Sequence, residues 1–201
     1  MFKKAFTLSE VLVVVGIIGV VAVLTLPTVI NSADRNKNIT QLRKVQNELQ
    51  AAFSQAITKY GDSEDWGAYG AQYPNRIFEF LDIKRCGITF PSTNYDSNIA
   101  SYPKCELKDG TLVASTGNAI LVALDGINGN VSGESVFGFD IYNNSGEIRP
   151  FGYESDMNAS TNAFIIGNDM IFATNWAIAN GNMDYLDCAA SLNWETKLTC
   201  K

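Results

Sequence analysis

The feature that most constrains this chain is an apolar segment near its N-terminus. Residues 11–26 form an apolar run that only two glycines and one threonine interrupt. As a helix, the stretch from Phe6 to Ile30 would be roughly 37 Å long, which is enough to cross the hydrocarbon core of a bilayer. Lys3 and Lys4 precede the run, so we expect the N-terminus in the cytoplasm and the rest of the chain outside.

A carboxylate stands at the entrance to this run, at Glu10. An ionised carboxylate at that depth in a membrane costs a few kcal/mol, which makes it a candidate functional residue whose partner has to be found. The next turn of the helix has no basic residue, so the partner has to come from elsewhere. Cleavage after Ala5 would give Phe6 a free amine, a positive charge at the same depth in this subunit or in a neighbouring one.

The stretch KKAFTLSEVLVVVGIIGVVAVLTLP resembles the N-terminus of type IV prepilins and of the pseudopilins of type II secretion systems. Those proteins have a short basic leader, a cut before Phe, then Thr-Leu, a variable residue and Glu. The resemblance implies that a prepilin peptidase cuts between Ala5 and Phe6 and methylates the Phe6 amine. It also implies that Thr7, Leu8 and Glu10 belong to an assembly motif, in which Glu10 meets the Phe6 amine of an adjacent subunit.

Two further positions bear on this resemblance. Pro27 matches the proline that bends or loosens the helix in many pilins, because proline removes one backbone hydrogen bond. Ala5 stands where the family usually has glycine, and we expect this small residue to be processed more slowly. The alternative to the prepilin interpretation is an ordinary signal anchor in which Glu10 is accidental.

An amphipathic stripe follows the proline and predicts that the helix continues, from about Thr7 to Tyr60. The stripe consists of Ile39, Leu42, Val45, Leu49, Phe53, Ile57 and Tyr60. Its one-sided pattern calls for a sheet to pack against it. We therefore divide the chain into a leader (1–5), a transmembrane and assembly helix (6–30), the amphipathic half of the same helix (31–60) and an extracytoplasmic head (61–201).

The remainder of the chain predicts a short helix followed by strands. Residues 76–86 have helical spacing, whereas residues 61–75 and 87–104 are rich in turn formers and indicate loops. Runs rich in β-branched residues at 111–115, 118–125, 136–142 and 147–151 predict an antiparallel sheet of three or four strands. The expected fold is α+β, with a long N-terminal helix packed on a small antiparallel sheet, as the resemblance to pilins also implies.

Four cysteines follow the N-terminal segment: Cys86, Cys105, Cys188 and Cys200. Behind an exported N-terminus this even count favours disulfides, and of the three possible connectivities we prefer the local ones, Cys86 to Cys105 and Cys188 to Cys200. Each would stabilise the fold by roughly 3 kcal/mol in the chain-entropy model. Four buried free thiols are the alternative. In type IV pilins a C-terminal disulfide often bounds the most variable surface.

Composition excludes several functional classes. The chain has no histidine, which removes the commonest general base and transition-metal ligand, and no catalytic motif takes its place, so we expect no enzymatic activity. Its net charge of −6 argues against nucleic-acid binding. An oxygen-rich loop with Asp125, Asn128 and Asn130 is a weak calcium candidate whose alternative is a plain turn, and no other cofactor is expected.

The leading hypothesis is a structural subunit of a type IV pilus or a type II secretion pseudopilus. Its expected partners are copies of itself, other pilins or pseudopilins, prepilin peptidase, the inner-membrane assembly platform and the membrane itself. It would start as a single-pass protein of the bacterial inner membrane. The alternative is a membrane-anchored extracytoplasmic binding module that does not assemble into filaments.

Overall fold

The structure is a computed structural model and describes most of the chain. The described residues are 7–66, 72–91, 103–117, 119–126, 133–142, 146–152 and 170–201, without the side chains of residues 24–31, 64, 65, 72–74 and 142. The chain divides into two compact units, Met1–Lys37 and Asn38–Lys201. We call the second unit the head and describe each unit by itself.

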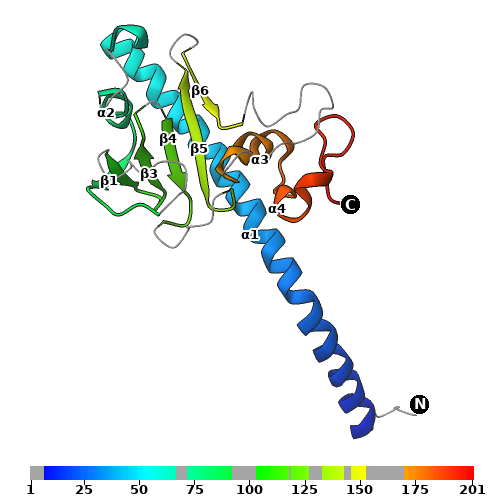
Figure 1. Cartoon of the computed structure of the whole chain (residues 1–201). Coiled ribbons are helices and arrows are strands. Elements are labelled where there is room, and N and C mark those ends of the chain that lie inside the picture. Colours follow the sequence, from blue (N-terminus) through cyan, green and yellow to red (C-terminus); the bar gives the residue numbers. More distant parts are fainter. Residues whose placement is uncertain are drawn as a thin grey trace, which may run out of the picture. The chain divides into compact units, whose positions relative to one another are not determined.

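One long helix and a six-stranded sheet dominate the described residues (Figure 1). The helix α1 spans Leu8–Tyr60, within one residue of the predicted start. The strands are β1 (Ile83–Cys86), β2 (Lys104–Leu107), β3 (Leu112–Ser115), β4 (Ala119–Ala123), β5 (Val136–Tyr142) and β6 (Glu147–Pro150). The short helices are η1 (Ser63–Trp66), α2 (Gln72–Phe78), η4 (Met170–Ala173), α3 (Thr174–Asn180), α4 (Tyr185–Cys188) and η5 (Ala189–Ser191).

The sheet is an antiparallel meander in which each strand pairs with the next along the chain. The register brings Val113 of β3 opposite Val122 of β4, and Val122 opposite Phe137 of β5. Alternate residues of a strand point to opposite faces, so these three side chains share one face. The predicted α+β fold is confirmed, with more strands than the three or four expected.

The head part of α1 packs on that face of the sheet. Leu42, Val45, Leu49 and Phe53 are fully buried, in one apolar cluster with residues of β3, β4, β5 and β6. Their spacing of three or four residues aligns them along one side of the helix, as the sequence predicted. Ala52 and Ala56 are buried with them, which lets the helix lie close to the strands.

The opposite face of the sheet is also covered. Every residue of β3 and β4 is buried, and Phe151 and Ile171 pack with the outward-facing side chains of these strands in a second apolar cluster. Gly138 of β5 makes room for this packing, because a Cβ atom there would lie 2.2 Å from the ring of Phe151. The sheet therefore lies between two apolar layers, of which α1 forms one.

Part of the prediction for residues 61–104 was wrong. The expected helix over residues 76–86 is instead the end of α2, which stops at Phe78, and the strand β1. Cys86 of β1 lies directly opposite Cys105 of β2, so the expected loop before Cys105 also ends in a strand. Local spacing suggested a helix, but pairing with a strand distant in sequence decides the structure. The predicted loop over residues 61–75 likewise includes η1 and the start of α2.

Candidate functional site

The first candidate site is the start of α1, where Thr7 and Glu10 bond to each other. The backbone N–H of Thr7 and its hydroxyl both donate to Oε2 of Glu10, each at 2.8 Å. In return, the backbone N–H of Glu10 donates to Oγ1 of Thr7 at 3.3 Å. This reciprocal pattern is a capping box, in which two side chains satisfy backbone groups that the first helical turn leaves unpaired.

The capping box gives Glu10 a partner that the sequence analysis did not consider. The signal was present in the sequence, because Thr followed three residues later by Glu before an apolar run is the signature of such a cap. An ionised carboxylate has about four acceptor positions, so bonding to Thr7 leaves it able to meet a cation as well. Leu8, the residue between them in the predicted assembly motif, is 81% exposed. The proposed cleavage residues, Ala5 and Phe6, lie outside the described residues.

Apolar side chains surround α1 on all sides after Glu10. The exposed large apolar residues of this unit are Leu8, Val11, Leu12, Val13, Val14, Val15, Ile17, Ile18, Val20, Val21 and Val23. Each is at least 49% exposed, although its side chain belongs in an apolar environment. An exposed apolar surface of this kind marks a site of interaction with a protein or a membrane.

The membrane span predicted for this unit is not seen directly. Among the residues whose side chains are described, no helical stretch reaches the length and hydropathy that crossing a bilayer requires. Pro27, the predicted kink, lies within α1. Its side chain lies outside the described residues, so its expected effect on the helix stays a prediction.

The two disulfides are the site residues that the structure brings together as predicted. Cys86 and Cys105 are bonded with Cα atoms 4.0 Å apart, and Cys188 and Cys200 with Cα atoms 5.8 Å apart. All four cysteines are paired, so the alternative of free thiols is wrong. Because such bonds persist in oxidising compartments, they indicate an extracytoplasmic location.

The second disulfide closes a loop, residues 188–200, that several further bonds hold in place. Asn193 and Lys197 form an isolated antiparallel bridge across the loop. The amide of Asn182 donates to the backbone oxygen of Leu198 at 2.9 Å, and a carboxylate oxygen of Asp184 accepts from the N–H of Cys200 at 2.7 Å. We call residues 188–200 the C-terminal loop. These bonds fix its backbone against the end of α3 and the start of α4.

The calcium candidate gains no support from the described residues. Asp125 is exposed, while Asn128 and Asn130 lie outside the described residues. In the part of the chain that the structure describes, no three His, Cys, Asp or Glu side chains are grouped so that they could hold a metal ion. Calcium binding by this loop stays a prediction.

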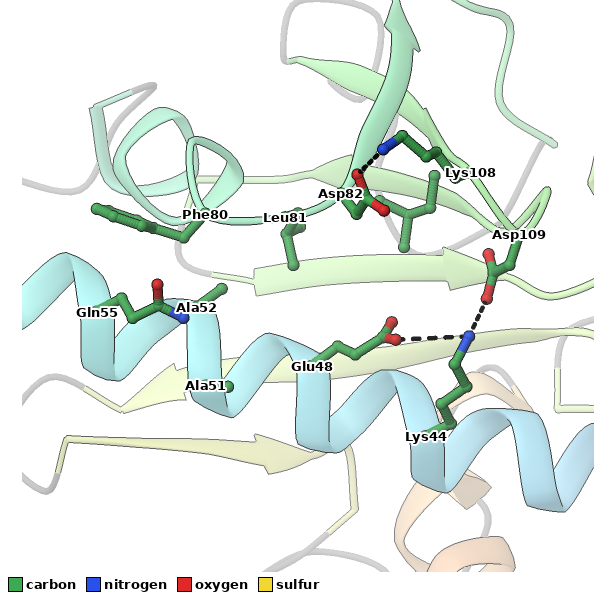
Figure 2. Close-up of a pocket in the computed structure, with 11 residues that line it drawn as sticks. Lys44, Glu48, Ala51, Ala52, Gln55, Phe80, Leu81, Asp82, Lys108 and Asp109 are labelled. Atoms are coloured by element: carbon green, nitrogen blue, oxygen red, sulfur yellow. Dashed lines mark hydrogen bonds and ion pairs between the residues drawn. The ribbon is translucent and has the colours of Figure 1, made fainter.

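A groove between α1 and the turn that joins β2 to β3 was not predicted. Its volume is about 290 Å³, and Figure 2 shows its lining, in which Lys44 of α1 bonds to both Glu48 and Asp109. The Lys44 Nζ atom lies 2.7 Å from Asp109 and 3.5 Å from Glu48. Burial opposes ionisation of Asp109, but bonds from Lys44 and Thr111 outweigh it and hold the pKa of Asp109 below its usual value.

The basic pair Lys84 and Arg85 is matched by a carboxylate on the neighbouring strand. Both donate to Glu106, each at 2.6 Å, and these two hydrogen bonds lower the pKa of Glu106. One carboxylate therefore offsets part of the charge of the two basic side chains.

The sequence matches no known family model, no curated protein and no solved structure.

Proposed function

We propose that this chain is a structural subunit of the type IV pilin kind, processed by prepilin peptidase and assembled through the N-terminal half of α1. The filament would be a type IV pilus or a type II secretion pseudopilus. The observation that carries the proposal is a helix with exposed apolar side chains all round, headed by the Thr7 and Glu10 cap. The resemblance of the first 30 residues to prepilins supports it.

The exposed apolar surface supplies the driving force. Burying a Val, Leu or Ile side chain stabilises by about 1.5–3 kcal/mol relative to water, so a helix with this surface needs lipid or other helices around it. Before assembly, membrane lipid would cover this apolar surface. On assembly, the neighbouring subunits' helices would replace the lipid.

Glu10 would set the register of the assembly. Peptidase cleavage before Phe6 leaves the peptide bond between Phe6 and Thr7 intact, so the N–H of Thr7 still holds the Glu10 carboxylate. The free acceptor capacity of the carboxylate would then meet the Phe6 amine of an adjacent subunit. A subunit out of place would bury both charges unpaired, which costs several kcal/mol.

The two disulfides fit the topology of this proposal. They form outside the cytoplasm, whereas Lys3 and Lys4 favour a cytoplasmic N-terminus. A single crossing between these two parts would put the head on the side of the membrane where the proposed filament grows. The same topology would suit a membrane-anchored binding module, so the test has to address assembly.

The test is Glu10→Ala in cells that assemble the filament. We expect the variant to be cleaved before Phe6 and methylated there, as mass spectrometry would show, while sheared filaments are lost. Glu147→Ala, which removes an exposed acid on the edge strand β6 of the head, is the matched control and should assemble normally. Normal filaments from Glu10→Ala would refute the mechanism, and an uncleaved N-terminus on the native chain would favour the binding module.

A further inference from the structure

We infer that heads contact one another in the filament through a specific pair of surfaces, the groove between α1 and the β2–β3 turn on one subunit and the C-terminal loop on the next. This inference rests on the proposed function, because it names the contact that an assembled head would make. The inserted side chain is Leu198, with Lys197 beside it. Three properties of the described residues carry the inference: apolar fit, charge and position on the head.

The groove has an apolar interior. Ala51 and Ala52 of α1 leave space along the helix, and Phe80 and Leu81 lie across from them (Figure 2). Leu107 also lines the groove. A cavity of about 150 Å³ lined by apolar groups is known to hold benzene, so about 290 Å³ has room for a leucine side chain and part of its neighbour. The groove can therefore take an inserted aliphatic side chain.

The charged rim of the groove favours a cation beside that side chain. Two lysines and three carboxylates line it: Lys44, Lys108, Glu48, Asp82 and Asp109. Lys108 pairs with Asp82, while Lys44 lies between Glu48 and Asp109 and is closer to Asp109. One lysine is thus shared by two carboxylates, and Glu48 has the longer contact. An incoming lysine would complete the pairing of Glu48.

The C-terminal loop presents the complementary group. Leu198 is 41% exposed, and among the described side chains of the head only Tyr60 is another large apolar residue with comparable exposure. Lys197, which precedes Leu198, is also exposed. The disulfide and the bond from Asn182 already fix the backbone here, so insertion would order few new groups and lose little entropy.

The two surfaces lie at different places on the head. Figure 1 shows β1 and α2, which adjoin the groove, on one side of the head and the C-terminal end of the chain on the other. One subunit cannot fill its own groove across this span. A contact between unlike surfaces of identical subunits repeats from each subunit to the next, and forms a filament when it does not close into a ring. The contact is therefore compatible with helical assembly.

The decisive experiment is cysteine cross-linking of the full-length chain in cell membranes and filaments. A chain carrying both Ala51→Cys and Leu198→Cys should give a ladder of disulfide-linked multimers on a non-reducing gel. Co-expression of the two single variants should give dimers and no ladder, because each chain then has one reactive surface. The control pair, Glu147→Cys with Leu198→Cys, places the partner cysteine on the edge strand β6 and should give neither.

Each outcome separates this inference from the proposed function. Filaments that depend on Glu10 but show no Ala51 to Leu198 ladder would overturn the head contact and leave the proposed function standing. A ladder from chains that form no filament would support the head contact and refute assembly through α1. Equal ladders from the Glu147 control pair would show non-specific collision and overturn the contact.

Charge reversal tests the contact without relying on insertion. In the cross-linking background, Lys197→Glu should lower the cross-linked fraction by about two- to five-fold, the size expected for an exposed ion pair. Adding Glu48→Lys should restore it, because the pair is rebuilt with its signs exchanged. Both side chains are solvent-accessible, so neither change should affect folding. Failure of the double variant to recover would overturn the assigned pairing.

Discussion

The two parts of α1 present their apolar side chains in opposite ways. In the head, Leu49 and Phe53 are fully buried on one side of the helix. In the N-terminal unit, Leu12 and Val23 are 66% and 72% exposed, and large apolar side chains occur on every side. Both parts are regular helix, so the difference lies in what covers them.

The two parts of α1 are therefore stabilised in different ways. The one-sided stripe of the head part packs on one face of the sheet, so its apolar side chains are buried within the same chain. Polar side chains of the head part also bond to the sheet and its turns, since Gln41 donates to Thr111 of the β2–β3 turn and Gln50 bonds to Ile148 of β6. The N-terminal part has an apolar surface that calls for an external partner. Substitutions in the two parts should therefore have effects of different kinds.

The largest expected effect is on the buried stripe. Phe53→Ala should lower the free energy of unfolding of the head by about 3–5 kcal/mol, because it leaves a cavity at a fully buried site. Val20→Ala, in the exposed part, should leave it unchanged. Urea unfolding of the full chain in detergent would measure both, since all three tryptophans lie in the head. Equal losses from the two variants would mean that the comparison is wrong.

A smaller effect is expected from a polar contact of the same part of α1. The amide of Gln50 donates to the backbone oxygen of Gly146 at 3.0 Å and accepts from the N–H of Ile148 at 2.8 Å, so it occupies part of the outer edge of the sheet. Gln50→Ala should destabilise the head by about 1–3 kcal/mol, since it leaves these backbone groups unpaired.

Hydrogen exchange would locate this effect. The N–H of Ile148 should exchange faster in Gln50→Ala. The exchange rates of the β3 amides should rise only by the amount that the loss of global stability explains. Asn47→Ala, at an exposed position on the same helix, is the control and should leave Ile148 protected. Unchanged protection of Ile148 in Gln50→Ala would show that the contact does not hold the edge strand.

Periodicity was sufficient to predict the helix and the central strands. The stripe from Ile39 to Phe53 repeats at helical spacing and is buried as expected, and the runs that became β3 to β6 have the β-branched composition of strands. The local disulfide pairing was also predicted correctly. These features depend on residues close together in the sequence.

Features that depend on distant residues were missed. The strand β1 lies at the end of residues 76–86, a stretch with helical spacing, and its pairing with β2 joins segments separated by a loop. The groove arises where α1 meets the β2–β3 turn, a contact that no local pattern contains. The cap of Thr7 and Glu10 is an exception, because its signal was local but the carboxylate was interpreted only through its expected intermolecular partner.

The smallest predicted effect is the pH dependence of the ion pair between Lys44 of α1 and Asp109. The pKa of Asp109 is held below its ordinary value of 3.8 in the folded head, so its charge stabilises the fold above that pH and ceases to do so as the pH falls through the lowered pKa. Asp109→Asn should lower stability at pH 7 by at most about 1 kcal/mol, since Lys44 is half exposed.

Because asparagine can still accept from the N–H of Thr111, this variant removes the charge and leaves the turn intact. The difference in unfolding free energy between Asp109→Asn and the native chain should therefore shrink as the pH is lowered below about 4 and fall with added salt. A difference that persisted in acid would mean that the side chain acts through packing. The contact between Lys44 of α1 and Asp109 would then stabilise the head in the same way as the buried stripe, through packing.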